Sequence, residues 1–387
     1  MLYTMTAKTL PGLEGVLAEE LKNLGAASIK NQSLAVGFSG DEELLYSANL
    51  HLRSALRVLV AVREFSANRT EQIYAEALEV PWETWLKPAG SLAVDAVVSS
   101  STFTHGSYCA LKVKDAVCDR FVKKFGRRPD VDTDSPDLRI NLRIHKEECA
   151  LSLDSSGESL HRRGYRTEKI EAPLSEVLAA GILLLSGWDM QSPLYDPMCG
   201  SGTFLAEAGL MSAGIPCGSL RKKFGFMSWK THTPELWKKV KTCAESLRRQ
   251  PAGGITGSDS DPNAVKIAHA NLLRAGLGDI PVSRSVFENS SPPPGKGLLV
   301  MNPPYGKRMR REDLNSRTHE PEAPQTDEIR ELYTRIGDTL KRSYTGWTAW
   351  LFSANMDAVK HIGLRPFRRI PLRNGPLECR LVGIKMF

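Results

Sequence analysis

The chain has 387 residues, 41% of them hydrophobic and 25% charged, and a formal net charge of +7. This length suits two or three domains that each bury a core, and the composition is that of globular proteins. The longest apolar run is too short to span a bilayer, the N-terminus shows no signal-peptide pattern, and the seven cysteines form no C-x-x-C pair. These features exclude a secreted disulfide scaffold and a membrane-spanning protein. We expect a cytoplasmic protein with reduced thiols, for which the positive charge is only weak evidence of a polyanionic partner.

The first 65 residues alternate short elements and predict a small α+β domain. The expected strands are 2–6, 34–38 and 56–63, and the expected helices are 13–24 and 42–50. Residues 66–160 predict a second α+β domain, with a helix from GSYCALKVKDAVCDRFVKKF and a hairpin from LRINLRIHKEECALSLD. The helix should end at Gly126, and its inward candidates are Leu111, Ala116 and Phe121. The polar, Arg-rich segment 161–172 is the expected linker.

The remaining chain, 173–387, alternates helices and strands. The expected helices are 173–186, one from Gly202, one capped by Asp261 and Pro262, and 327–344. The expected strands end at Tyr195 or cover 254–257, 298–301 and 348–353. Such alternation predicts a parallel sheet with helices on both faces and a ligand at the carboxyl ends of the strands.

A Gly-rich turn follows the first of these strands in YDPMCGSGTFLAEA. Gly200 and Gly202 let the backbone approach a ligand, and the helix behind them offers unpaired N–H groups. A nicotinamide dinucleotide site would need a third glycine, where Leu205 stands, and an acid about twenty residues further on. Neither is present, so this site is not expected to bind a dinucleotide.

Two acids follow two strands. Asp259, in GSDSD, can hold two ribose hydroxyls, Ser260 can lie against an adenine, and Asp196 suits an α-amino group. A ligand with ribose, adenine and an amino acid but no pyrophosphate is S-adenosylmethionine. The residues expected around this cofactor are Asp196, Pro197, Cys199, Gly200, Gly202, Thr203, Asp259, Ser260 and Asn302. Within this set, Cys199 is expected as a small packing residue and not as a nucleophile.

The segment LLVMNPPYGKRMRR ends a predicted strand on Asn302, Pro303, Pro304 and Tyr305. An exocyclic amine is a poor nucleophile because its lone pair is delocalised. Two acceptors, the Asn302 side-chain oxygen and the Pro303 carbonyl, can rotate it toward a reactive geometry, and the Pro-Pro pair keeps them aimed. Tyr305 offers a ring on which an extruded base can stack. These four residues are therefore the predicted catalytic set.

DPMCGSGT and NPPY resemble motifs I and IV of class I methyltransferases that modify amino groups. Over nearly its whole length the chain resembles the THUMP-domain RNA guanine-N2 methyltransferases, nearest to the bacterial group that acts on large-subunit (23S) ribosomal RNA. The other segments that carry the resemblance are YCALKVKDAVCDRF, LHRRGYR, APLSEVLAAGILLLSGW, KFGFMSWKTHTPELW, LFSAN and NGPLECR.

The resemblance implies a Rossmann-like methyltransferase domain with a mostly parallel seven-stranded sheet at 173–387. A ferredoxin-like domain at 1–65 and a THUMP RNA-binding domain at 66–160 would precede it. It also implies S-adenosylmethionine as cofactor, RNA as partner, a monomer or weak dimer, and no metal or membrane. Relatives with a C-terminal 7-methylguanine domain have two activities, and we expect one activity here because the chain ends at Phe387. An adenine-contacting Asp of many relatives aligns with Val286, so a backbone group or Glu288 would replace it.

Several basic runs are candidate phosphate contacts. The expected RNA-binding residues are Lys112, Lys114, Lys123, Lys124, Arg127, Arg128, Arg162, Arg163, Arg166, Lys307 and Arg308. The N-P-P-Y motif does not distinguish guanine from adenine. A guanine-N2 methyltransferase of transfer RNA, an N6-adenine methyltransferase and a non-catalytic RNA-binding assembly factor therefore stay open as alternatives.

Overall fold

This computed structural model describes residues 2–166, 174–251, 253–306 and 324–387. The contacts within it divide the chain into two compact units. The first unit comprises Met1–Leu10, Glu14–Arg163 and Pro216–Ser246, and the second comprises Pro11–Leu13, Gly164–Ile215 and Leu247–Phe387. The chain therefore passes back and forth between the units.

Every strand and helix expected in the first unit is present, with ends shifted by a few residues. The elements are β1 (Tyr3–Thr9), α1 (Glu14–Asn23), β2 (Ala27–Gln32), β3 (Ala35–Gly40), α2 (Glu42–His51), β4 (Ala55–Ser66), α3 (Thr70–Glu79), β5 (Ser91–Ser99), α4 (Gly106–Phe125), β6 (Asp130–Val131), β7 (Leu138–His145) and β8 (Glu148–Asp154). The sequence patterns did not predict β2, α3, β5 and β6. The sequence does not predict β2 because this strand is polar, lies at the sheet edge and has no alternation of apolar residues.

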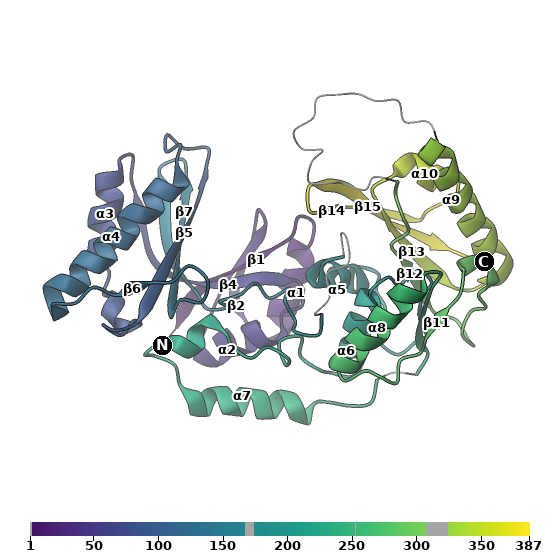
Figure 1. Cartoon of the computed structure of the whole chain (residues 1–387), viewed down its shortest axis with the longest axis horizontal. Coiled ribbons are helices and arrows are strands. Elements are labelled where there is room, and N and C mark those ends of the chain that lie inside the picture. Colours follow the sequence, from purple (N-terminus) through teal and green to yellow (C-terminus); the bar gives the residue numbers. More distant parts are fainter. Residues whose placement is uncertain (1, 167–173, 252, 307–323) are drawn as a thin grey trace. The chain divides into compact units, whose positions relative to one another are not determined.

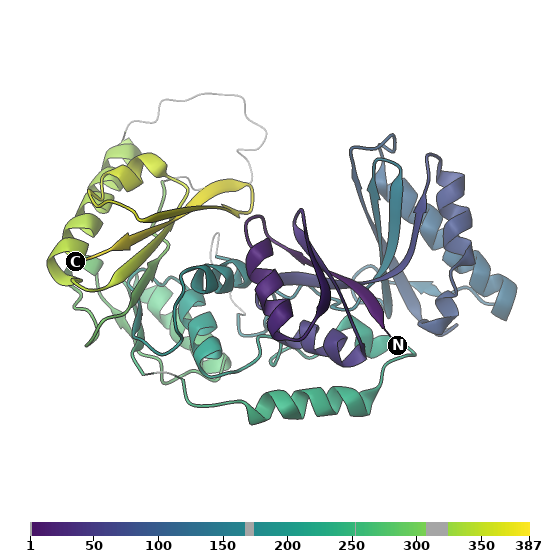
Figure 2. The ribbon, with the colours of Figure 1, turned by 180° about the vertical axis from the view of Figure 1, so that it is seen from behind.

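The strands described in the first unit form one eight-stranded sheet in the order β2-β3-β1-β4-β8-β7-β5-β6. Figure 2 shows the purple strands from the start of the chain and the blue strands beside the helices α3 and α4. β4 pairs antiparallel with β1 on one side and with β8 on the other. Met5, Val60 and Leu153 lie opposite one another in these pairs, and all three are buried. The two expected α+β domains thus share one hydrophobic cluster. The boundary expected at residue 65 falls inside β4, which both halves use.

Helix α4 buries a stripe that only partly matches the expectation. Ala116 and Phe121 are buried as predicted, together with Cys109 and Val113. Leu111 was expected to face inward, but it is 50% exposed. It is two residues from Cys109 and hence about 200° away around the helix, which puts it on the opposite side.

The insertion 216–246 packs within the first unit, although it lies in the middle of the expected catalytic domain 173–387. Its helix α7 (Pro234–Ser246) lies beside α2 (Figure 1). Trp237 meets the ring of Tyr46 edge-on at 5.8 Å between centroids, and Phe226 packs on the same ring at 4.4 Å. By their contacts residues 216–246 therefore belong to the first unit, where these aromatic side chains join the core.

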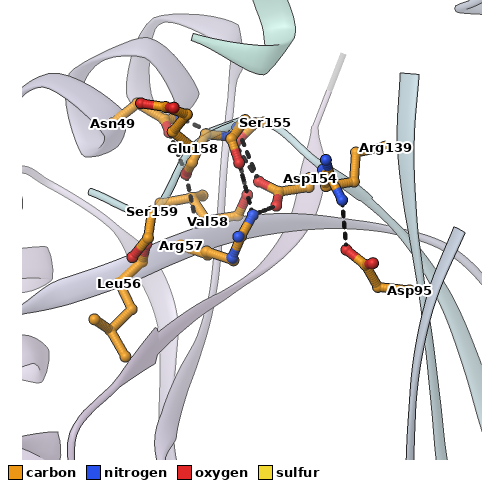
Figure 3. Close-up of polar contacts among 12 residues, drawn as sticks. Asn49, Leu56, Arg57, Val58, Asp95, Arg139, Asp154, Ser155, Glu158 and Ser159 are labelled. Atoms are coloured by element: carbon orange, nitrogen blue, oxygen red, sulfur yellow. Dashed lines mark hydrogen bonds and ion pairs between the residues drawn. The ribbon is translucent and has the colours of Figure 1, made fainter. Parts of the chain in front are cut away.

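Polar contacts hold β8 and β4 together where the two halves of the sheet meet (Figure 3). Arg57 forms an ion pair with the buried carboxylate of Asp154 and also donates to the carbonyl of Gly157 at 2.7 Å. Burial raises the pKa of Asp154, and the charge of Arg57 opposes this rise. Arg139 and Asp95 form a second pair, at 2.9 Å, between β7 and β5. These pairs stabilise the shared sheet on both sides of β8.

The second unit contains the seven-stranded sheet that was expected. Its elements are α5 (Glu176–Leu185), β9 (Leu194–Asp196), α6 (Thr203–Ser212), β10 (Ile255–Asp259), α8 (Pro262–Arg274), β11 (Val282–Arg284), β12 (Leu298–Met301), α9 (Pro324–Ser343), β13 (Thr348–Ser353), α10 (Met356–Lys360), β14 (Arg368–Asn374) and β15 (Leu377–Lys385). The strand order is β11-β10-β9-β12-β13-β15-β14, parallel except at β15. α9 covers one face of the sheet, and α5, α6 and α8 lie on the other (Figure 1). The strand order reverses between β9 and β12, which in this fold class marks the ligand-binding crevice.

Candidate active site

The three sequence motifs meet at one edge of this sheet. β9 pairs in parallel with β10 on one side and with β12 on the other. Asp196 ends β9, Asp259 ends β10 and Asn302 follows β12 directly. Because neighbouring parallel strands present their carboxyl ends on the same side, the two carboxylates and the amide lie at the same edge of the sheet.

The Gly-rich turn is tied to the neighbouring strand by hydrogen bonds. The N–H of Gly200 donates to Asp259 Oδ2 at 2.8 Å, and the N–H of Cys199 donates to the carbonyl of Ser258 at 3.0 Å. Gly200 and Gly202 have φ values of +53° and +75°, a left-handed conformation that favours glycine. A Cβ on Gly200 would meet no atom within 4 Å, whereas one on Gly202 would lie 3.1 Å from Ala268 Cβ. Gly200 therefore borders open space, and Gly202 allows α6 to approach α8.

The two acids differ in environment. Asp196 is 1% exposed, and its Oδ1 accepts from the N–H of Met198 at 3.3 Å. Burial first, and the charge of Asp259 second, raise the pKa of Asp196 well above its usual range. Asp259 is half-buried and accepts from two backbone N–H groups, those of Gly200 and Asp261. A cationic ligand group beside Asp196 would relieve the cost of its ionisation.

The other residues expected at the cofactor are buried around the turn, with one exception. Pro197, Cys199 and Thr203 are buried, and Ser260 is exposed at the rim. Burial raises the pKa of the Cys199 thiol, which agrees with a packing role and not with a nucleophile. The Thr203 hydroxyl accepts from the guanidinium of Arg166 at 2.5 Å.

The N-P-P-Y loop is held against two other strand ends. The Tyr305 hydroxyl donates to Asn302 Oδ1 at 2.8 Å, and Pro303 is buried whereas Pro304 is exposed. Asn355 and Asn374 both donate through Nδ2 to Tyr305, to its carbonyl and its hydroxyl oxygen respectively, each at 3.4 Å. These two asparagines lie in LFSAN and NGPLECR, which resemble the family, but the sequence predicts no role for either of them. Only the family resemblance of the two segments could point to these residues, because no local sequence pattern shows which side chains contact Tyr305.

Val286 stands where many relatives have an adenine-contacting Asp, and the two expected substitutes are a backbone group and Glu288. Val286 is 44% exposed, and Glu288 forms an ion pair with Arg335 at 2.7 Å. The carboxylate of Glu288 is thus already paired with an arginine of α9. A backbone group is therefore the better candidate for the adenine contact.

The basic candidates divide into exposed and buried groups. Arg163 is 1% exposed and donates to the carbonyls of Leu160 and Arg53, and Arg166 pairs with the buried Glu176 at 3.4 Å. The expectation that these two residues reach RNA is therefore corrected, because both guanidinium groups serve the interior. The exposed candidates in the first unit are Lys123, Lys124, Arg127, Arg128 and Arg162.

Carboxylates and an aromatic ring already partner several of the remaining cations. Lys124 pairs with Glu83 at 2.6 Å, Lys114 pairs with Asp115 at 2.8 Å, and the ammonium of Lys112 lies 5.4 Å from the Tyr108 ring centroid. Arg162 pairs with Glu158 at 3.2 Å. Lys307 and Arg308 lie outside the described residues.

The described residues contain neither a candidate membrane span nor a candidate metal site. No helix in this part of the chain is long and apolar enough to cross a membrane. No group of three or more His, Cys, Asp or Glu side chains there could hold a metal ion.

The sheet order and the residues at its edge define the second unit as a class I methyltransferase fold. Residues 163–383 match the family described as "RMKL-like, methyltransferase domain", and the chain belongs to that family. Residues 67–154 match the THUMP domain and residues 4–59 match the RlmL ferredoxin-like domain. The fold class expected from the sequence is confirmed.

Three relatives illustrate how far the similarity extends. "Ribosomal RNA large subunit methyltransferase K/L" of Syntrophotalea carbinolica is 41% identical over 386 residues, covering 96% of this chain and 52% of that protein. "Putative RNA methyltransferase slr0064" of Synechocystis is 38% identical over 378 residues, covering 97% and 95%. The structure of SMU.472, a putative methyltransferase complexed with SAH, has a TM-score of 0.87 and 28% identity, covering 100% and 98%. The chain thus spans about half the length of the K/L relative and nearly all of the Synechocystis one.

Proposed function

We propose that this chain transfers a methyl group from S-adenosylmethionine to the exocyclic N2 amine of a guanine in 23S ribosomal RNA. The observation that carries the proposal is the meeting of Asp196, Asp259 and Asn302 at one sheet edge. The ribosomal substrate is supported by the name of the K/L relatives. Guanine N2 rests on the resemblance of the whole chain to the THUMP-domain enzymes.

The residues at the edge fit the cofactor. Asp196 is buried with a raised pKa, so a cationic amino group is a favourable neighbour, and open space borders Gly200 where a Cβ would intrude. Asp259 keeps lone pairs for ribose hydroxyls, because each of its oxygens accepts one backbone N–H. When bound, S-adenosylmethionine supplies a methyl group on a positively charged sulfonium, and the neutral thioether that remains after transfer is a good leaving group.

Asn302 and Pro303 act on the guanine amine. The Asn302 Oδ1 and the Pro303 carbonyl accept hydrogen bonds from the two N–H groups of this amine. This geometry rotates the nitrogen lone pair out of conjugation with the base. The amine becomes positive as it forms its new bond, and these two acceptors stabilise that charge. The excess proton then passes to solvent. No side chain has to act as a nucleophile.

The RNA grip is assigned to the first unit. The THUMP match at 67–154 supports this role, and the exposed Lys123, Arg127 and Arg128 follow one another at the end of α4. Phosphate contacts by such residues position RNA without reading its sequence. Charge reversal at Arg127 and Arg128 should therefore weaken RNA binding more at low salt than at high salt.

Tritiated methyl transfer tests the proposal. Protein-free 23S RNA, a precursor particle and bulk transfer RNA are each incubated with labelled S-adenosylmethionine, and the labelled nucleoside is identified. N2-methylguanosine in 23S RNA is the expected result. Label in transfer RNA alone, or N6-methyladenosine, would overturn the substrate assignment, and no label in any RNA would favour the non-catalytic assembly factor.

The Asn302→Ala variant tests the assigned chemistry. It should lose methyl transfer and keep the affinity for RNA, because the first unit is unchanged. Asn23→Ala, an exposed asparagine at the end of α1, is the matched control and should retain activity. Loss of RNA binding together with activity in Asn302→Ala would argue against the assigned role.

A further inference from the structure

The amide of Asn302 is the end point of a hydrogen-bond chain that begins on another strand. Asn374 Nδ2 donates to the Tyr305 hydroxyl oxygen at 3.4 Å, and that hydroxyl donates to Asn302 Oδ1 at 2.8 Å. Asn374 is the last residue of β14, at the far edge of the sheet from the Gly-rich turn. The chain of contacts thus links the catalytic loop to the β14–β15 hairpin.

The hairpin holds Asn374 firmly. Asn374 pairs with Leu377, which leaves Gly375 and Pro376 as a two-residue turn. Gly375 has a φ of +58°, as the first central position of a type II′ turn requires. The backbone that carries the Asn374 side chain is therefore fixed by the turn on one side and by the strand pair on the other.

The other end of Tyr305 is held as well. Asn355 Nδ2 donates to the Tyr305 carbonyl at 3.4 Å, while Asn355 Oδ1 caps α10 by accepting from the N–H of Ala358 at 2.9 Å. Tyr305 is therefore anchored through its backbone by one asparagine and through its hydroxyl by another. Its hydroxyl can serve as a fixed reference for Asn302.

The orientation of the Asn302 amide matters for the reaction. Its oxygen and its NH₂ exchange places on a half-turn of the side chain with almost no change in shape. An amine substrate offers only donors, so the oxygen must face it. A tyrosine hydroxyl alone cannot select that orientation, because it can donate to the oxygen or accept from the NH₂.

Asn374 resolves this ambiguity in the orientation that it has in the structure, where its NH₂ faces the hydroxyl. Its NH₂ can only donate, so it occupies a lone pair of the Tyr305 hydroxyl and leaves the hydroxyl proton for Asn302. The chain of hydrogen bonds then has one direction, from Asn374 through Tyr305 to Asn302 Oδ1. The second lone pair of Oδ1 stays available for the substrate amine.

We propose that Asn374 is a positioning residue that acts through the Tyr305 hydroxyl to keep the Asn302 oxygen facing the substrate amine. This inference rests on the proposed methyl transfer to an exocyclic amine. It gives the Tyr305 hydroxyl a function separate from stacking by its ring.

Two substitutions of similar size at position 374 test the direction of the hydrogen bonds from Asn374 through Tyr305 to Asn302. Asn374→Leu removes the donor, and kcat at saturating RNA should fall about tenfold, the equivalent of one hydrogen bond. Asn374→Asp should lower kcat further, because its carboxylate only accepts and turns the hydroxyl proton of Tyr305 away from Asn302. The KM for S-adenosylmethionine should stay within about twofold in Asn374→Leu, because this variant leaves the acids and the Gly-rich turn unchanged.

The Tyr305→Phe background is the matched control. It lacks the hydroxyl but keeps any effect of charge or folding at position 374. In that background, Asn374→Leu and Asn374→Asp should have equal kcat values. A difference that persists without the hydroxyl, or an Asp variant more active than the Leu variant, would overturn the proposal.

A second measurement requires no RNA and separates this inference from the proposed function. In protein labelled at the tyrosine ring carbon that bears the hydroxyl, the Tyr305 signal is assigned by its loss in Tyr305→Phe and titrated by NMR. Burial already raises the pKa of Tyr305, and the Asn374 donor opposes this rise. Asn374→Leu should raise the pKa further, and an unchanged value would overturn the chain of contacts. Wild-type protein inactive on every RNA, with the expected pKa change, would refute the proposed function and leave the Asn374–Tyr305 contact established.

Discussion

An added Cβ would contact Ala268 at Gly202 but would contact no atom at Gly200, and this difference gives a quantitative test of the Gly-rich turn. Both have positive φ, so alanine at either position adds a strain of about 1–2 kcal/mol. Only Gly202 is crowded: a Cβ there would lie 3.1 Å from Ala268 Cβ and 3.3 Å from Ala268 Cα, and the Cα belongs to the backbone of α8 and cannot rotate away. Overpacking of this kind costs about 1–3 kcal/mol more. Gly202→Ala should therefore unfold at a lower temperature than Gly200→Ala, by roughly 2–4 °C for each kcal/mol of that difference.

Cofactor affinity should rank the two variants in the opposite order. Gly200→Ala, the more stable variant, should lose more affinity for S-adenosylmethionine than its stability suggests. The new Cβ of Gly200→Ala points into open space beside Asp259, where the proposed cofactor lies. Calorimetry should show a loss of S-adenosylmethionine affinity in Gly200→Ala that is large for its small thermal shift. Thermal unfolding midpoints without cofactor provide the comparison. Equal midpoints for the two variants would refute the packing argument, and normal cofactor affinity in Gly200→Ala would refute the position given to the cofactor.

Three further predictions follow from other contacts. The pKa of Asp196 is raised in the folded chain, so folding favours the protonated carboxyl. Ionisation of Asp196 therefore costs stability, and this cost grows as pH rises from about 4 toward the pKa of the folded state. Asp196→Asn should therefore raise the unfolding midpoint of the cofactor-free protein more at pH 8 than at pH 5, and calorimetry should show weaker S-adenosylmethionine binding; a uniform gain at both pH values would contradict this. Asn355→Asp keeps the cap of α10 but replaces the donor to Tyr305 with an acceptor that the carbonyl repels, so methyl transfer should fall by about tenfold. Asn355→Ala loses the cap as well as the donor and should lose about 1 kcal/mol of stability through the cap alone. Trp237→Ala should destabilise the first unit by about 3–5 kcal/mol and weaken RNA binding in filter assays while calorimetry shows unchanged S-adenosylmethionine affinity; a matching loss of cofactor affinity would contradict the assignment of the insertion.

The elements of the second unit could be predicted closely because their signals are local. β12 and β13 have the bounds expected from their apolar runs, and α8 begins at the expected Asp261–Pro262 cap, with Asp261 accepting from the N–H of Asn263 at 2.8 Å. Parallel alternation of such elements implies that strand ends share an edge. The meeting of Asp196, Asp259 and Asn302 was predictable for this reason.

The fold of the first unit could be predicted only in part. The pairing of β4 with β8 joins residues about ninety positions apart, such as Val60 and Leu153, and no local pattern encodes it. The insertion 216–246 has ordinary amphipathic character, so the sequence does not show which core its aromatic residues enter. Cores that are built from distant segments require tertiary contacts to be known.

The interior contacts of Arg163 and Arg166 show why runs of basic residues are poor guides to an RNA surface. In LHRRGYR only Arg162 is exposed, because Arg163 is buried and donates to backbone carbonyls and the partly buried Arg166 pairs with Glu176. A buried guanidinium contributes to the net charge but cannot reach a phosphate. The RNA-binding proposal therefore depends on the exposed cations at the end of α4, and the salt dependence of binding by their charge-reversed variants measures how many of them make phosphate contacts.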